Sequence, residues 1–406
     1  MNYTYVGIDN HSKTHTAVVL NCFFEKIGVI RFDNNIAKFP AFLEAVTKLK
    51  LDGTTLMFGL EDVSLYGWIL LTFLKNNHQQ VKHTNPSLVF SERKTRNITR
   101  KSDAVDAECA ARVLITNFGE LPDAIPNDSI WTLRTLVVRR KQIIRGNMGI
   151  KSNLHSLLLN HYPNYRDFFG NIDCKSSLEF YSKYPSPNRL KGTTVEELAI
   201  FLWETGHFYG EEKAAEIISS IDDTTVQFQE YRDISVQSLI RQLKFNLDEL
   251  VRLEVSIARA MENINTPLTS MAGIDTTSAA QLLSCIGDIK RFPTSGKLAQ
   301  YAGVAPITFA SGDVDKQYAS RCGNRELNSL IYNLAIRVST TSGCRRKVLN
   351  TFFHDYYNRK ISEGKTKRQA LKCVERRLIH VIWTMLTNNE EYINPPTYNL
   401  ENSIGG

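Results

Sequence analysis

The chain has 406 residues, 42% of them hydrophobic, which is enough for two or three domains with cores of their own. Its net charge of +7 is only mildly basic, no stretch is apolar over the length of a membrane span, and the first residues lack the regions of a signal peptide. Seven widely spaced cysteines without a CxxC pair argue against a disulfide framework or a zinc ribbon and for a reducing compartment. We therefore expect a cytoplasmic protein that does not enter a membrane.

The first 120 residues predict an α/β domain. Residues 3–9, 14–20 and 26–32 are short segments rich in β-branched and aromatic side chains, which are typical of strands. Apolar spacing then predicts a helix, a strand, a helix, a strand and a helix, over residues 36–49, 56–60, 68–75, 80–83 and 103–116. Three strands followed by this alternation is the order of a ribonuclease-H-like fold.

The remainder of the chain is predicted to be mainly helical. Two long helices over 130–159 and 226–263 flank a polar, aromatic stretch at 162–190, which is interpreted as a loop or an insertion. Such a pair of helices suggests an antiparallel arm, or a coiled coil used for dimerisation. Short helices with glycine turns follow from residue 268, and an amphipathic helix over 367–386 precedes a polar tail.

These elements divide the chain into four predicted parts. Residues 1–125 form the ribonuclease-H-like domain, and 126–265 form the helical arm with its insertion at about 160–225. Residues 266–390 form a mainly helical domain, and 391–406 are a tail.

Basic residues are concentrated in three segments. Between residues 345 and 377, eleven basic residues stand against three acidic ones. Each cluster alone is explained by a solvated helix face, but three in one chain favour a polyanionic partner such as nucleic acid. The other two clusters contain no acid and comprise Arg93, Lys94, Arg96, Arg100 and Lys101, and Arg134, Arg139, Arg140, Lys141, Arg145 and Lys151.

Four carboxylates are expected to converge in the first domain. Asp9 ends the first strand and Glu61 follows the strand 56–60, so both reach the carboxyl edge of the sheet, where α/β proteins bind ligands. Asp103 and Asp106 lie three apart at a helix start and share one face. Such a cluster holds Mg²⁺, although a turn, a helix dipole or plain surface exposure would also explain each residue singly. Asp62 is an alternative metal ligand at this position. Strand alternation puts Glu61 and Asp62 on opposite faces, and we prefer Glu61.

Two segments of the third part are candidates for phosphate contacts. Residues 268–287 resemble a helix-hairpin-helix around Gly273, whose backbone N–H groups would bind phosphate, although an ordinary helix pair explains them equally well. Ser311 is expected in a loop with small neighbours, where its hydroxyl could attack phosphorus; serine–glycine turns are also common as plain turns. A basic, polar stretch with Arg321, Asn324 and Arg325 follows.

The order of these motifs resembles a known family, the DEDD-type insertion-sequence transposases. This group includes bridge-RNA-guided recombinases and pilin-gene invertases, and pairs a RuvC-like domain with a C-terminal serine transposase domain. About two thirds of the chain takes part in the resemblance. The matching segments are YVGIDNHSKTHTAVVL (5–20), FGLED (58–62), KHTNP (82–86), RKSDAVDAECAARVL (100–114), the stretch 272–312, RCGNRELNSLIYNLA (321–335) and the closing helices at 356–386.

The resemblance implies a site-specific DNA transposase with two sets of catalytic residues. Asp9, Glu61, Asp103 and Asp106 correspond to the acidic tetrad that holds Mg²⁺ or Mn²⁺. Ser311 corresponds to the serine that attacks a DNA phosphodiester, forms a phosphoserine link and leads to a Holliday-type junction. The two sets are expected to meet between protomers of a homodimer or homotetramer. The resemblance also implies a prokaryotic cytoplasmic protein that is at the nucleoid during activity. DNA and a guide RNA are the expected partners.

Two departures and two alternative functions stay open. The family's Pro-Gly-Ile-Gly turn is Ala272-Gly273-Ile274-Asp275 here, and Asp313 replaces a glycine after Ser311-Gly312. A Holliday-junction-type metal-dependent endonuclease would use the carboxylates without the serine. A basic nucleic-acid-binding protein without catalysis would use neither.

Overall fold

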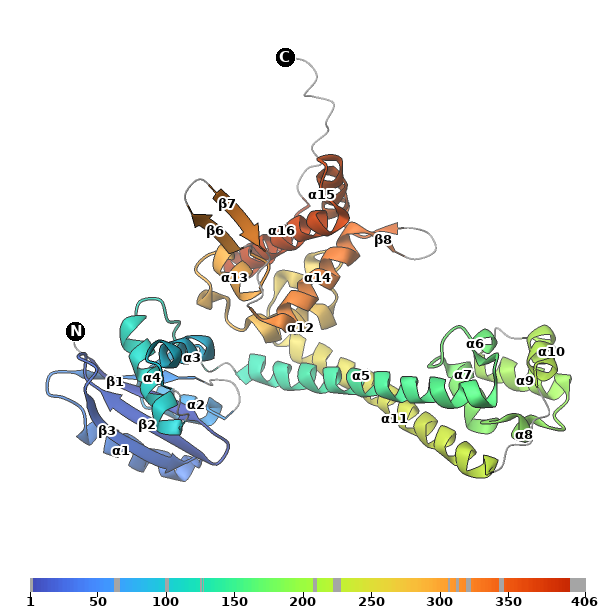
Figure 1. The fold of residues 1–406 in the computed structure, drawn as a ribbon, viewed down its shortest axis with the longest axis horizontal. Helices are drawn as coiled ribbons and strands as arrows, with labels where there is room; N and C mark the ends of the chain where they lie inside the picture. Colours follow the sequence, from blue (N-terminus) through green and yellow to red (C-terminus); the bar gives the residue numbers. More distant parts are fainter. Residues whose placement is uncertain are drawn as a thin grey trace, which may run out of the picture. The chain divides into compact units, whose positions relative to one another are not determined.

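The computed structural model describes residues 3–61, 66–98, 102–124, 126, 128–206, 210–221, 228–305, 307–311, 314–318, 323–342 and 347–394. Two compact units are distinguished: residues 132–265 together with 274–284, and the rest of the chain. Most of the described residues outside the N-terminal sheet are helical (Figure 1). Within the described ranges, no helix is both long enough and apolar enough to cross a membrane.

The N-terminal part is built on one five-stranded sheet with the order β3-β2-β1-β4-β5. The first three strands are antiparallel neighbours, and β4 and β5 run parallel to β1. All five strands lie where the sequence predicts them, because their apolar side chains alternate or run continuously through a buried sheet. Their bounds are Tyr3–Asn10, Thr14–Leu20, Lys26–Asp33, Thr55–Leu60 and Gln80–His83.

Helices cover both faces of this sheet (Figure 1). On one face, α1 (Phe39–Lys48), which follows the short 3-10 turn Ile36–Lys38, and α2 (Trp68–Asn76) pack against the even-numbered residues of β1. On the other face lie α3 (Pro86–Thr95) and α4 (Asp103–Thr116). α3 was not predicted from the sequence. Asn85-Pro86 marks the start of this helix, since the Asn85 side chain caps it by accepting a hydrogen bond from the Ser87 N–H.

Two glycines let α4 lie directly on the sheet. Gly7 of β1 faces α4, and a Cβ at this position would overlap the backbone of Ala107 and Ala111. Gly59, its partner on β4, would meet side chains of Thr84 and Leu114. The close approach brings the N-terminus of α4 to the end of β1 that carries Asp9.

Replacing Gly7 with alanine is expected to push α4 away from β1. An overpacked core costs about 1–3 kcal/mol, and backbone atoms on the other side leave little room to relax. We expect a lower thermal midpoint and faster amide exchange in both β1 and α4. Gly119→Ala is the matched control, because no atom lies within 4 Å of an added Cβ there. Equal exchange in the two variants would contradict this account.

The middle of the chain forms a helical arm. α5 (Asp128–His161) and α11 (Gln229–Glu262) run antiparallel, as two side-chain contacts between them show. The Arg140 guanidinium lies 2.7 Å from a carboxylate oxygen of Glu254, and Asn246 donates a hydrogen bond of 2.7 Å to Asn147.

The insertion between the arm helices is a small helical lobe. Residues 162–190, interpreted as a loop or an insertion, contain short helices, because their aromatic residues form a core with the ends of both arm helices. Tyr162, Phe168, Phe180 and Tyr181 are fully buried in it. The helices of the lobe are α6 (Tyr165–Phe168), α7 (Lys175–Lys183), α8 (Pro187–Leu190), α9 (Val195–Gly206) and α10 (Glu211–Ser219).

The C-terminal part is mainly helical with small hairpins. The elements of this part are two 3-10 turns (Pro267–Ser270 and Ile289–Arg291), α12 (Thr276–Ile286), α13 (Ser295–Tyr301), β6 (Ile307–Ser311), β7 (Val314–Tyr318), α14 (Arg325–Ser339), β8 (Thr341–Ser342), β9 (Lys347–Val348), α15 (Thr351–Ser362) and α16 (Lys367–Asn388). α14 packs on both α15 and α16, and a capping box of Thr366 and Gln369 begins α16.

Candidate metal centre

Asp9 lies at the carboxyl end of β1, on the face that α4 covers. It continues the alternation of Tyr5 and Gly7, which both face this helix, and it is 8% exposed. Glu61 follows β4 at the same edge, since Ile8 pairs with Leu60 in the parallel register. A ring nitrogen of His83 lies 3.2 Å from the Glu61 carbonyl oxygen. Asp62, the alternative ligand, lies outside the described residues.

The N-terminus of α4 supplies the other two carboxylates. Ser102 caps the helix by accepting a hydrogen bond of 3.3 Å from the Val105 N–H, and Asp103 and Asp106 occupy the first turn. Acidic side chains are favourable there because the helix dipole is positive at this end. Asp106 is buried and Asp103 is half-buried.

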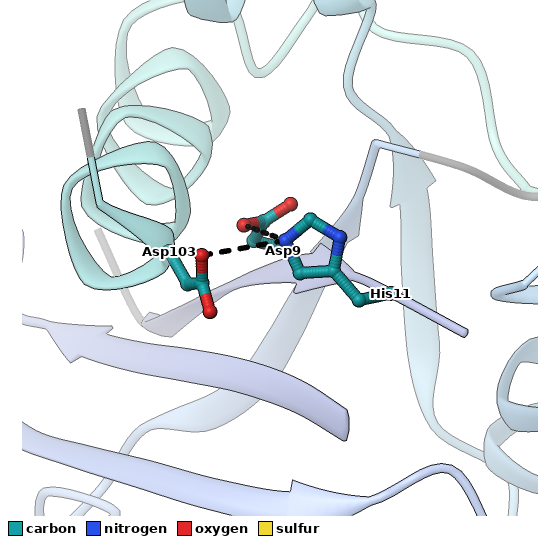
Figure 2. Close-up of side chains that lie close together, drawn as sticks. All are labelled: Asp9, His11 and Asp103. Atoms are coloured by element: carbon teal, nitrogen blue, oxygen red, sulfur yellow. Dashed lines mark ion pairs between the residues drawn. The ribbon is translucent and has the colours of Figure 1, made fainter. Parts of the chain in front are cut away.

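His11 joins these carboxylates, and the sequence analysis did not include it. Its Nε2 atom lies 3.1 Å from Asp9 Oδ2 and 3.4 Å from Asp103 Oδ1 (Figure 2). Its backbone N–H donates a hydrogen bond of 3.3 Å to His15 Nδ1, which holds the turn after β1. The spacing of His11 could have indicated this contact, because the side chain two positions after Asp9 returns to the same face of an extended chain.

Asp9, His11 and Asp103 form the close group among the described residues. One donor atom from each lies within 4.8 Å of the others, and Asp106 and Glu61 are outside this group. Burial raises the pKa of Asp9; the charge of His11 opposes this shift, while Asp106 and Asp103 raise the pKa further. Burial is thus the main cause of the raised pKa of Asp9, and the two neighbouring carboxylates add to it.

Asp106 has a cationic partner on α3. The guanidinium of Arg93 donates a hydrogen bond of 2.7 Å to Asp106 Oδ1, and Arg31 lies 3.9 Å from Asp103 Oδ2. Arg93, a predicted nucleic-acid contact, thus lies at the edge of the carboxylate cluster.

A second buried acid of α4 organises the cations around it. Glu108 pairs with Lys26 of β3, with Arg96 at 2.9 Å and with Arg112 at 3.4 Å. Burial alone would raise the pKa of Glu108, but hydrogen bonds and charges of Lys26 and Arg96 outweigh it and lower the pKa. Arg96 therefore ties α3 to α4 and helps to hold the helix that carries Asp103 and Asp106.

Replacing Glu108 with glutamine is expected to destabilise the N-terminal part by about 1–3 kcal/mol near pH 7, because three partly exposed cations lose their charged partner. The lowered pKa means that the ion pairs stabilise the fold above the ordinary value of 4.5 and lose this effect as the pH falls through the folded value. Hydrogen exchange of β1 and α4 should therefore differ at pH 7 and converge in acid. Glu44→Gln, at an exposed ion pair with Lys48, is the control and should match the wild type. A Glu108→Gln difference that does not change with pH would contradict this assignment.

The other predicted nucleic-acid contacts have mixed surroundings. Arg140 pairs with Glu254, whereas Lys94, Arg139 and Arg325 are exposed. Lys141 is half-buried. Arg100, Lys101 and Arg321 lie outside the described residues.

Asn324 and Gly273 have clear structural roles in the C-terminal part. Asn324 caps α14 by accepting hydrogen bonds of 3.0 Å from the N–H groups of Glu326 and Leu327. Gly273 has a φ of 106°, which favours glycine, and its carbonyl accepts a hydrogen bond of 3.0 Å from Arg337.

Ser311 is the last residue of β6, where the sequence predicted a loop. It pairs with Val314 across the hairpin, and Gly312 and Asp313 lie outside the described residues. The Ser311 side chain is not among the described parts of the structure.

Two family models match the two segments that carry these residues. One, described as Transposase, matches residues 6–163, and the other, described as Transposase IS116/IS110/IS902 family, matches residues 265–350. The chain belongs to this transposase family. The first match contains Asp9, Glu61, Asp103 and Asp106, and the second contains Ser311. The family is one of DNA transposition enzymes.

Individual relatives support the same assignment over most of the chain. The insertion element IS110 uncharacterized 43.6 kDa protein of Streptomyces coelicolor is 28% identical over 72% of each chain. The insertion element IS116 uncharacterized 44.8 kDa protein of Streptomyces clavuligerus is 24% identical over 97% of this chain and 96% of its own. The pilin gene-inverting protein of Moraxella bovis is 29% identical over 31% of this chain and 37% of its own.

Proposed function

We propose that the protein is the site-specific transposase of an insertion sequence, which cuts and rejoins DNA strands with the help of Mg²⁺ or Mn²⁺. The observation that carries this proposal is the meeting of Asp9 and Asp103 around His11, with Asp106 near enough to raise the pKa of Asp9. This cluster lies within a segment that matches a transposase model. The strand order, with three antiparallel and two parallel strands, supports a ribonuclease-H-like fold for residues 1–125.

The donor set fits a divalent cation. Carboxylate oxygens are the ligands that suit both Mg²⁺ and Mn²⁺, and Asp9 and Asp103 supply such oxygens here. Asp9, Glu61, Asp103 and Asp106 would hold the metal, which supplies charge stabilisation at the reacting phosphodiester. The chain's own contribution is positional: β1 and β4 present two carboxylates at one edge, and the Ser102 cap fixes the start of α4.

Ser311 is proposed to be the nucleophile. Its hydroxyl oxygen forms a bond to the phosphorus of a DNA phosphodiester, and one P–O bond to the neighbouring nucleotide breaks. The released DNA oxygen takes up a proton as the serine loses one, so that a phosphoserine and a free DNA hydroxyl result. Attack by the DNA hydroxyl of another strand on the phosphoserine reverses these changes and joins the strands through a Holliday-type junction.

The proposed partners are DNA, a guide RNA and further copies of the chain. The pilin gene-inverting protein, by its name, acts on the arrangement of a gene, which supports DNA recombination as the activity here. We place the acidic site and Ser311 of one reaction centre on different protomers of a homodimer or homotetramer. The arm, residues 126–265, would serve this assembly as a coiled coil, and 266–390 would form the transposase domain.

The test is a recombination assay with purified protein, Mg²⁺, DNA that carries the element ends and target, and RNA co-expressed from the element. The expected products are recombinant joints and an SDS-resistant protein–DNA adduct. Cleavage without an adduct would favour the junction endonuclease. Absence of all products with every substrate, together with salt-sensitive DNA binding, would favour the non-catalytic binding protein.

A further inference from the structure

A cavity of about 420 Å³ lies between α13, α15 and α16 in the C-terminal part of the chain. This volume is within the range of about 300–1,000 Å³ that is usual for ligand pockets. The lysine and arginine side chains that line it come from α15 and α16, and no carboxylate is among the lining residues. The lining side chains that matter for binding are Ser295, Tyr356, Lys360, Arg376, Arg377 and His380.

Two guanidinium groups on α16 provide the positive charge. Arg376 and Arg377 are exposed, and neither forms an ion pair with any residue in the described part of the chain. Lys360, by contrast, lies 2.7 Å from a carboxylate oxygen of Glu363. Adjacent arginines in a hollow that lacks acids are suited to phosphate, because guanidinium N–H groups bind its oxygens in pairs.

Polar and aromatic groups line the same cavity. Nδ1 of His380 lies 3.1 Å from the Ser295 hydroxyl oxygen, which joins α16 to the start of α13. The half-buried Tyr356 ring has the Arg359 guanidinium 5.2 Å and the Lys360 ammonium 5.4 Å from its centroid. Cations next to an aromatic ring are the combination by which proteins bind single nucleic-acid strands, through phosphate contacts and base stacking.

We propose that this cavity binds one phosphodiester segment of a nucleic-acid strand. Arg376 and Arg377 contact the phosphate, Ser295 and His380 add hydrogen bonds, and Tyr356 packs against the base or sugar. The inference rests on the proposed function only for the class of ligand, and the site is separate from the carboxylate cluster.

The first test compares two double variants of α16. Arg376→Ala with Arg377→Ala removes the cavity charges, and Lys367→Ala with Arg368→Ala removes the same charge from exposed positions outside the cavity. Binding of fluorescent single-stranded RNA, single-stranded DNA and duplex DNA is measured by anisotropy in EDTA at several salt concentrations. For the strand that occupies the cavity, we expect the cavity variant to bind about tenfold more weakly than the control variant.

Salt dependence separates a phosphate contact from a general loss of charge. Loss of two phosphate contacts should reduce the slope of log K against log salt by about 1.4 for a single strand and about 1.8 for a duplex. The nucleic acid whose affinity and salt slope change most identifies RNA or DNA as the source of the phosphodiester. Equal affinities and slopes for the two double variants with all three nucleic acids would overturn the proposal.

A second measurement uses the wild-type protein and does not depend on the folding of a variant. Cys373 lines the cavity and is a half-buried free thiol, and Cys174 of the insertion is a similar thiol elsewhere. A saturating oligonucleotide should slow alkylation of Cys373 by iodoacetamide several-fold and leave Cys174 unchanged, as read by peptide mass spectrometry. Unchanged alkylation of Cys373 would overturn the proposal. Because the buffer contains EDTA, both results are independent of strand cleavage, so failure of the proposed transposase activity would be seen separately.

Discussion

Asp9→Asn and Asp106→Asn are each expected to abolish recombination, with rates at least about 10³-fold below that of the wild type. Several kcal/mol of charge stabilisation at the phosphodiester depend on the metal, and each 1.36 kcal/mol corresponds to a factor of about ten. Asparagine keeps the size of the side chain and removes the negative charge that holds the cation. The measurement is the initial rate of joint formation over a range of Mg²⁺ and Mn²⁺ concentrations.

Asp52→Asn is the matched control for this experiment, because Asp52 is an exposed carboxylate after α1. It should recombine at the wild-type rate. Both cluster variants should still bind DNA in EDTA, since phosphate contacts by basic residues do not need the metal. Recombination by Asp9→Asn at the wild-type rate would exclude the carboxylates from catalysis and with them the proposed metal centre.

Ser311→Ala is expected to eliminate the SDS-resistant protein–DNA adduct and all joint formation. The hydroxyl is the only group that alanine lacks, so DNA binding and the thermal midpoint should remain as in the wild type. The control is Ser362→Ala, an exposed serine whose hydroxyl bonds to its own helix through the Arg359 carbonyl. Adduct formation by Ser311→Ala would exclude this serine as the nucleophile.

A mixture of two inactive variants tests whether the reaction centre is shared between protomers. Asp9→Asn and Ser311→Ala proteins, co-refolded or co-expressed, should regain part of the activity, since some assemblies then contain one intact acidic site beside one intact serine. A mixture as inactive as its components would contradict a shared centre and would favour both sets of residues acting within one protomer.

Much of the N-terminal domain could be predicted from the pattern of apolar residues. Its five strands and α4 begin and end within one residue of the predicted bounds, because their apolar residues follow the periodicity of strands and of a helix. The prediction that Asp9, Glu61, Asp103 and Asp106 converge used local features, namely strand ends and a helix start. The close group in the structure contains Asp9 and Asp103 with His11, and the role of the four carboxylates stays a prediction. The helix α3 was missed, since Val89 is its only buried residue and its sequence has little apolar periodicity.

The insertion and the basic clusters were interpreted less well. Aromatic residues at 162–190 stand among prolines and polar residues, so their common core with α5 and α11 depends on contacts between distant segments. Arg93, Arg96 and Arg140 were assigned together to nucleic acid, but carboxylates of other elements pair with all three. A charge's partner is set by the packing of helices and not by its sequence neighbours. Whether these arginines also contact DNA stays a prediction.

By itself, the sequence determined the strand and helix types of the first domain, the positions of the acidic candidates and the family, because these depend on periodicity and on the order of short motifs. Only the tertiary structure decided which groups meet. Gly7 allows α4 to approach β1, and this contact brings Asp103 to Asp9 with His11 between them. The tertiary structure also decided that Arg376 and Arg377 share a cavity without acids, while Arg93 lies against Asp106. The physical reason is that hydrogen bonds form over about 3 Å and screened coulombic interactions fade beyond about 10 Å, and such distances between remote residues exist only after packing.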